Sequence, residues 1–133
     1  MSVTIWHNPA CGTSRNVLAM IRNSGEEPVI RDYLRQPPDA AALRDALART
    51  GLPARALLRR KGAPFAELGL DDPALDEEAL IAAMLAHPIL IERPLVFTAR
   101  GARLCRPSEV VLEILEQPQR APFSKEDGTP VHG

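Results

Sequence analysis

The sequence predicts an α/β fold whose mixed four-stranded sheet takes its elements in the order β-α-β, a helical insertion, and then β-β-α. Two segments carry this prediction. Residues 3–33 have the pattern of a strand, a helix and a second strand, and residues 95–117 have the pattern of a β-hairpin followed by a helix. The segment between them is rich in helical signals, so we expect an inserted helical layer over residues 39–87.

The first segment predicts a βαβ unit. Residues 3–6 alternate as a short strand does, and residues 13–23 place apolar side chains on one face of a helix. Ser24-Gly25 supplies a glycine that can end this helix, and Pro28 prevents its continuation. Residues 29–33 can then return as a strand parallel to the first, through a right-handed crossover.

The inserted layer is expected to contain two longer helices and two short ones. The longer helices begin at Asp39 and Asp76, whose side chains can accept hydrogen bonds from the first turn, and they end at Gly51 and before Pro88. The expected short helical segments cover residues 54–60 and 65–68.

The last third of the chain predicts two antiparallel strands and a final helix. Residues 89–91 are expected to be extended, and residues 95–105 to form a hairpin with Gly101 in its turn. Pro107 suits the first turn of a helix that Pro118 stops. We therefore expect one domain over residues 1–117 and a loosely held tail over residues 118–133.

Composition excludes several classes of protein. A chain of 133 residues with a formal net charge of −1 is long enough for one compact core and lacks the basic charge of a nucleic-acid-binding protein. No apolar run approaches the roughly 18 residues that span a bilayer, so we expect a soluble, cytoplasmic protein. We also expect a monomer, although the sequence does not fix the oligomeric state. Cys11 and Cys105 are far apart and lack CxxC spacing or clustered histidines, which argues against a disulfide scaffold and a zinc site.

Cys11 lies where the first predicted strand meets the first predicted helix, and this is a favourable setting for thiol chemistry. The first turn of a helix carries unpaired N–H groups and a partial positive charge, both of which stabilise a thiolate. Gly12 lets the backbone approach a ligand, while Thr13 and Ser14 offer hydrogen-bonding groups. We interpret Cys11 as a reactive nucleophile, the alternative being a free cysteine that happens to precede a helix.

Four sequence motifs stand out in the chain: HNPACGTSRN at residues 7–16, RALLR at 55–59, HPILIERP at 87–94 and RLCRPSEV at 103–110. With these motifs in this order, the chain resembles the glutathione- and glutaredoxin-coupled arsenate reductase family, which has the thioredoxin/glutaredoxin-like fold. The resemblance covers about residues 3–128.

By this resemblance, Cys11 is the catalytic nucleophile, and Arg59, Arg93 and Arg106 bind the arsenate oxyanion. The resemblance also implies glutathione as co-substrate, glutaredoxin as partner, and no bound metal or organic cofactor. Ser14 stands at the second cysteine position of a CxxC motif, so no neighbouring thiol can resolve an intermediate on Cys11.

Three other residues have two interpretations each. His7 could lower the pKa of Cys11 when protonated, or it could simply occupy the end of the strand. Cys105 could resolve an intermediate, but a strand-end cysteine is more often structural. Arg15 could steer anions or be solvated. The resemblance to thioredoxin-type folds, in which the equivalent proline usually follows a cis peptide bond, raises the same possibility for Pro94, but the sequence alone leaves the isomer open.

Three functional classes remain open on the sequence. The first is an arsenate reductase, the second is a thiol transferase acting on glutathione mixed disulfides, and the third is a non-catalytic transcription regulator of the same fold. Only the first explains Arg59, Arg93 and Arg106 together.

Overall fold

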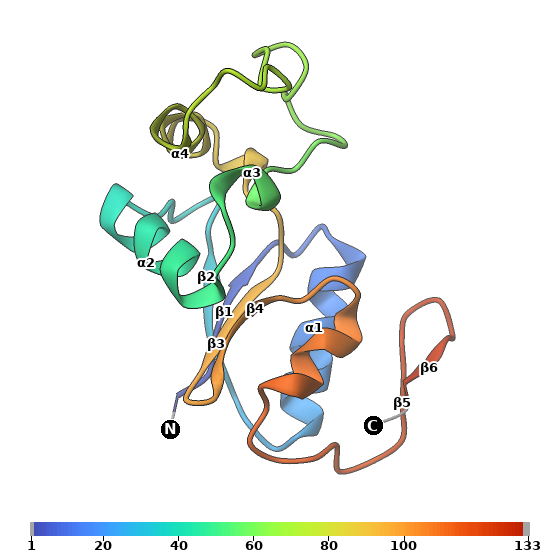
Figure 1. Ribbon diagram of the computed structural model, residues 1–133. Coiled ribbons are helices and arrows are strands. Elements are labelled where there is room, and N and C mark those ends of the chain that lie inside the picture. The colour runs from blue at the N-terminus through green and yellow to red at the C-terminus, as the bar shows by residue number, and fades with distance from the viewer. Residues whose placement is uncertain (1, 132–133) are drawn as a thin grey trace. The chain divides into compact units, whose positions relative to one another are not determined.

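The structure is a computed structural model that describes residues 2–131. The chain divides into two compact units (Figure 1). One unit contains the residues up to Asp32 and those from Arg93 onward, and the other is Tyr33–Glu92. The helical insertion expected over residues 39–87 lies inside the second unit.

A four-stranded sheet forms the centre of the first unit. Its strands are β1 (Thr4–His7), β2 (Val29–Asp32), β3 (Leu95–Thr98) and β4 (Gly101–Leu104), in the order β2-β1-β3-β4. β1 is parallel to β2 and antiparallel to β3, and β3 is antiparallel to β4. The mixed sheet and the βαβ unit that the sequence predicted are therefore confirmed.

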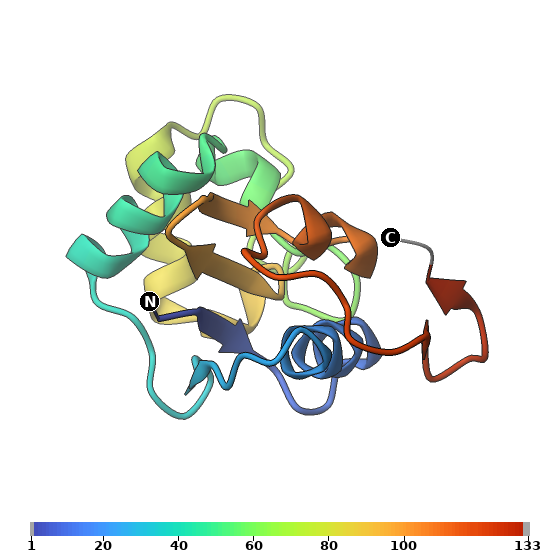
Figure 2. The same ribbon diagram turned by 90° about the horizontal axis from the view of Figure 1, so that it is seen from below.

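Two helices, α1 (Gly12–Asn23) and the 3-10 helix η2 (Ser108–Glu113), lie side by side against this sheet (Figures 1 and 2). Ile5 of β1 is paired with Val96 of β3, and both side chains point into the apolar core that these helices cover. Val17, Met20, Ile21, Val111, Ile114 and Cys105 are also fully buried there. Burial of this apolar surface fixes α1, and with it the segment that precedes α1.

The tail differs from the sequence expectation. Residues 118–133 were expected to be loosely held, but β5 (Phe123–Ser124) and β6 (Pro130–Val131) pair as an antiparallel hairpin. Phe123 and Val131 pack against the core of the first unit, and Gln119 donates a hydrogen bond of 2.8 Å to the carbonyl of Met20 in α1. These contacts lie between residues distant in the sequence, so the local composition could not predict them. Residues 132–133 lie outside the described residues.

The second unit is helical. It contains α2 (Ala40–Thr50), α3 (Ala54–Leu57), α4 (Glu77–Ala86) and the 3-10 helix η1 (Pro88–Leu90). α4 contacts α2, α3 and η1, and it contributes the buried side chains of Leu80, Ile81 and Met84.

Side-chain caps set where these helices begin, as the sequence predicted. Asp39 accepts a hydrogen bond of 2.8 Å from the N–H of Ala42, and Asp76 accepts one of 2.8 Å from Ala79. α2 ends at Gly51, whose φ of 73° is the left-handed conformation that glycine adopts without steric cost.

Several short elements differ from the expectation for local reasons. The helix expected over residues 54–60 stops at Leu57, because Leu58 becomes extended and forms a β-bridge with Ile91. Residues 65–68 form turns only, and the expected extended segment at 89–91 is largely η1. The final helix is the short 3-10 helix η2, with i→i+3 bonds such as Val110 N–H to the Pro107 carbonyl (3.1 Å).

Within residues 2–131, none of the helices combines the length and the apolar composition that crossing a membrane requires.

The cap at Asp39 gives the first prediction. Replacing Asp39 by Ala leaves an N–H of α2 without its acceptor and lowers the free energy of unfolding by about 1 kcal/mol in urea titrations. Asp45→Ala is the matched control, because Asp45 is exposed on the same helix and caps nothing. Equal losses for the two variants would contradict a capping role.

Candidate functional site

Cys11 occupies the N-cap position of α1, directly after the turn that follows β1. Its N–H donates to the carbonyl of Asn8 (3.0 Å), and its own carbonyl accepts the N–H of Arg15 (3.0 Å). The Asn8 side chain accepts the N–H of Ala10 (2.9 Å), which tightens the turn. No acidic residue lies in the first turn of α1, so nothing within the helix opposes a negative charge at its N-terminus.

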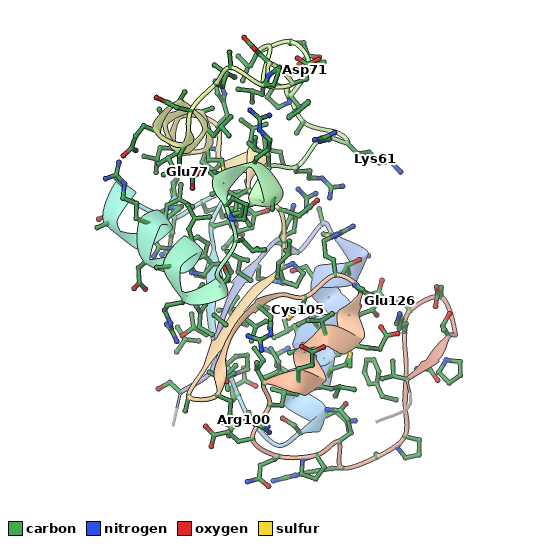
Figure 3. The ribbon with its side chains drawn as sticks, viewed as in Figure 1. Lys61, Asp71, Glu77, Arg100, Cys105 and Glu126 are labelled. Carbon is green, nitrogen blue, oxygen red and sulfur yellow. The ribbon has the colours of Figure 1, made fainter. Side chains whose placement is uncertain are left out.

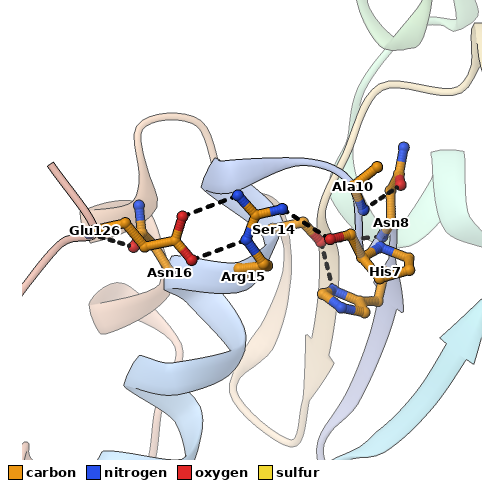
Figure 4. A network of polar contacts seen from close by, with 8 residues as sticks. His7, Asn8, Ala10, Ser14, Arg15, Asn16 and Glu126 are labelled. Carbon is orange, nitrogen blue, oxygen red and sulfur yellow. Dashed lines mark hydrogen bonds and ion pairs between the residues drawn. The ribbon is translucent and has the colours of Figure 1, made fainter.

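Ser14 ties this turn to the end of β1. Its hydroxyl oxygen lies 2.6 Å from Nδ1 of His7 and accepts the N–H of Asn8 at 3.1 Å (Figure 4). All three residues are buried, with Ser14 fully so. Because buried polar groups are costly to leave unpaired, this arrangement holds the Cys11 segment in one conformation.

Arg93 and Arg106 reach Cys11 from the two ends of the β3–β4 hairpin. The N–H of Cys105 donates to the carbonyl of Pro94 (2.9 Å), which brings the residues flanking the hairpin together. Nη1 of Arg106 then lies 3.8 Å from Sγ of Cys11 and 3.1 Å from the carbonyl of Arg93. The peptide bond before Pro94, which the sequence left open, is cis, and a second cis bond precedes Pro107.

The charge state of Cys11 follows from opposing effects. Partial burial raises the pKa of its thiol, but hydrogen bonds from the Ser14 backbone and from Arg93 and Arg106, with the positive charge of Arg93, outweigh it. The pKa of Cys11 therefore lies below its ordinary value, which increases the thiolate fraction at neutral pH.

The surroundings of His7 disfavour its protonated form. Burial lowers its pKa below the ordinary value, although the carboxylate of Asp32 opposes the effect. This favours the neutral imidazole at neutral pH and disfavours the interpretation in which a protonated His7 lowers the pKa of Cys11. Its contact with Ser14 instead makes it a structural support of the turn.

Cys105 has the opposite environment to Cys11. It is fully buried in the apolar core of the first unit (Figure 3), and burial raises the pKa of its thiol to about 12. Such a thiol is almost entirely protonated at neutral pH and is a poor nucleophile, which favours the structural interpretation.

For Gly12 and Thr13, the structure gives less evidence of a role beside Cys11 than it does for Ser14. A Cβ at Gly12 would meet Nη2 of Arg15 and Oε1 of Glu126 at 3.7 Å, an ordinary contact, so the backbone there does not require glycine. Thr13 is half-buried in the first turn of α1.

Arg59 belongs to the other unit, Tyr33–Glu92. There its Nη1 forms an ion pair of 2.7 Å with Glu92, and both side chains are largely buried. Its buried Nε has no hydrogen-bond partner among the described residues. The structure thus brings Cys11, Ser14, His7, Arg93 and Arg106 together in one unit and keeps Arg59 beside a carboxylate in the second.

Sequence reasoning missed Glu126, which lies beside the Cys11 segment although it is far along the chain. No local motif marks it. Within residues 2–131, no group of three or more His, Cys, Asp or Glu side chains is arranged to bind a metal ion.

Residues 6–114, which include Cys11, Arg93 and Arg106, match the ArsC family. The chain belongs to the ArsC family. It is 60% identical over 131 residues to the arsenate reductase of Rhizobium meliloti (strain 1021), a match that covers 98% of this chain and 94% of that protein. It is 57% identical over 130 residues to the arsenate reductase of Escherichia coli (strain K12), covering 98% and 92% of the two chains.

A solved structure agrees with this assignment. The arsenate reductase from Vibrio cholerae superimposes with a TM-score of 0.82 at 46% identity, covering 86% of this chain and 98% of that one. The thioredoxin-like architecture of the ArsC family therefore accounts for the fold described above.

The pKa of Cys11 gives the second prediction for this ArsC-family chain. In a Cys105→Ser protein, the rate of iodoacetamide alkylation plotted against pH should have its midpoint below the ~8.5 of a free thiol. Arg106→Ala should move the midpoint upward, since it removes a donor and a cation from the sulfur. Arg103→Ala, which removes an exposed arginine of β4, is the control and should leave the midpoint in place. A midpoint at or above that of a free thiol would contradict activation of Cys11.

Proposed function

We propose that this chain reduces arsenate to arsenite with Cys11 as the nucleophile. The observation that carries the proposal is the Cys11 sulfur at the start of α1, which Arg106 contacts and whose thiol pKa the Ser14 backbone, Arg93 and Arg106 lower. Arsenate, like phosphate, carries about −1.5 to −2 charges near neutral pH, so it repels a thiolate unless cations lie beside both. The names of the relatives, arsenate reductases, support the same substrate.

The reaction begins with attack of the Cys11 thiolate on arsenic. A sulfur–arsenic bond forms, and one arsenate oxygen leaves as water after protonation. A second thiolate then attacks the Cys11 sulfur. The electron pair of the sulfur–arsenic bond passes to arsenic, which is released as arsenite, while the two sulfurs become a disulfide. Arsenic gains the two electrons that the thiols lose.

We propose glutathione as the second thiol and glutaredoxin as the protein that reduces the resulting mixed disulfide. Ser14 holds the position where a resolving cysteine would stand, and the thiol of Cys105 is buried and protonated. The chain therefore has no competent second thiol among its own cysteines. Because the electrons come from thiols, the proposal needs no bound cofactor, and a reducing compartment such as the cytoplasm suits it.

The three arginines are proposed to bind the oxyanion. Planar guanidinium groups can offer two donors to one edge of a tetrahedral anion, which lysine cannot reproduce. Within one unit, Nη1 of Arg106 lies beside the sulfur of Cys11 and donates to the carbonyl of Arg93, and both arginines supply hydrogen bonds to that sulfur. The buried Nε of Arg59 has no hydrogen-bond partner among the described residues. Because its Nη1 pairs with Glu92, an anion bound by Arg59 must share this guanidinium with a carboxylate.

The thiol assignment gives the third prediction. Cys11→Ser should form no arsenite with glutathione and glutaredoxin, whereas Cys105→Ser should keep most of the activity. With arsenate and glutathione but no glutaredoxin, intact-mass and peptide analysis should find one glutathione on Cys11. A stoichiometric Cys11–Cys105 disulfide in a single turnover would overturn the external route and indicate thioredoxin as the reductant.

The arginines give the fourth prediction. Arg59→Ala, Arg93→Ala and Arg106→Ala should each lower kcat/KM for arsenate by roughly ten- to a hundredfold, the scale of one charge-assisted hydrogen bond of about 1.5–3 kcal/mol. Arg44→Ala and Arg103→Ala remove exposed ion pairs in the two units and should leave kcat/KM nearly unchanged. Unaltered kinetics in all three site variants, with retained reduction of glutathione mixed disulfides, would instead identify a thiol transferase.

A further inference from the structure

Polar contacts from the two residues that follow β5 attach the β5–β6 hairpin to the rest of the first unit. Lys125 forms an ion pair of 2.6 Å with Glu109 of η2. The next residue, Glu126, faces α1, where its N–H donates to Oδ1 of Asn16 (3.0 Å). Together with the apolar contacts of Phe123 and Val131, these bonds hold Glu126 in a fixed place beside the N-terminal turn of α1.

Glu126 and Arg15 form a bidentate ion pair. Nε of Arg15 lies 2.8 Å from Oε2, and Nη2 lies 2.9 Å from Oε1 (Figure 4). The remaining nitrogen, Nη1, donates to the carbonyl of Pro9 at 2.8 Å. Every nitrogen of this guanidinium therefore has a partner, and Arg15 joins the tail to the turn that carries Cys11.

This bridge acts close to the nucleophile. Pro9 lies two residues before Cys11. A Cβ placed on Gly12, the residue after Cys11, would lie 3.7 Å from Nη2 of Arg15 and 3.7 Å from Oε1 of Glu126. The turn is thus held on its buried side by Ser14 and on its exposed side by Arg15. The cation of Arg15 also lies near enough for the negative charge of a Cys11 thiolate to stabilise it.

We infer that Glu126 is a positioning residue for Cys11: it orients Arg15 so that one end of the guanidinium fixes the Pro9 carbonyl while the cation stays beside the thiolate. Most exposed ion pairs contribute little to stability, because two long side chains lose freedom to form them. Here the bidentate geometry removes rotational freedom from Arg15, and the third nitrogen makes that orientation useful to the Cys11 turn.

The direction in which the pKa of Cys11 moves when Glu126 is removed tests this role. As a charge alone, the Glu126 carboxylate disfavours a nearby thiolate, so its removal would lower the pKa of Cys11. As a positioning residue, its loss releases Arg15 and raises that pKa. In the Cys105→Ser protein, Glu126→Ala should raise the alkylation midpoint of Cys11 by about 0.5 pH unit, which is the scale of one exposed ion pair. A lowered or unmoved midpoint would overturn the inference.

A matched control exists at the other end of the same helix. Arg22 and Glu27 form an exposed bidentate pair, with distances of 3.0 Å for both Nε–Oε1 and Nη2–Oε2. Glu27→Ala removes it without touching the Cys11 turn, so the midpoint should stay in place. A rise as large as that of Glu126→Ala would mean that any weakening of α1 moves the midpoint, which would refute a specific role for Glu126.

A double-variant cycle tests whether Glu126 acts through Arg15. Arg15→Ala should raise the midpoint by itself, and adding Glu126→Ala should raise it no further. Additive rises would show an independent action of Glu126 and contradict the inference.

Arsenate kcat/KM should fall about threefold in Glu126→Ala, a result that rests on the proposed function. Alkylation requires no arsenate, so the positioning role can hold or fail separately from the proposed reaction.

Discussion

A thiolate that is partly withdrawn from water must be compensated by hydrogen-bond donors and cations, and this requirement governs the unit that contains Cys11. Burial opposes ionisation of the thiol, and the backbone of Ser14 with Arg93 and Arg106 overcomes it. These groups come from the start of α1 and from both ends of the β3–β4 hairpin. Because β1 is paired with β2 and β3 in the sheet, all of these elements converge where β1 ends.

The two cysteines show how strongly the surroundings decide thiol chemistry in one chain. Cys105 is separated from Arg106 by a single peptide bond, yet its side chain points into the apolar core and its thiol pKa rises to about 12. Cys11 is remote from Arg106 in sequence but lies beside its guanidinium in space. Proximity along the chain is therefore a poor guide to reactivity, and the direction in which the side chain points is decisive.

The βαβ unit, the hairpin and the setting of Cys11 could be predicted because each depends on local signals: periodicity, a glycine and prolines that end helices, and a cysteine before an amphipathic segment. The protonation state of His7 could not, since burial lowers its pKa while the carboxylate of Asp32 opposes this effect. The contact between Arg15 and Glu126 joins residues too distant in sequence for any pattern to connect. The sequence predicted a final helix, but not that it is a short 3-10 helix.

The unit that contains Cys11 is discontinuous, because the whole of Tyr33–Glu92 intervenes between its two parts. During synthesis, β1 can pair with β2 once Asp32 has emerged, but its other edge stays open until β3 follows the helical unit. At that stage α1 can already supply backbone donors to the sulfur of Cys11, while Arg93 and Arg106 have not yet been synthesised. A nascent chain therefore has the backbone donor of Ser14 but lacks both guanidinium groups beside the sulfur, and the full lowering of the Cys11 pKa is reached only when the C-terminal part joins the sheet.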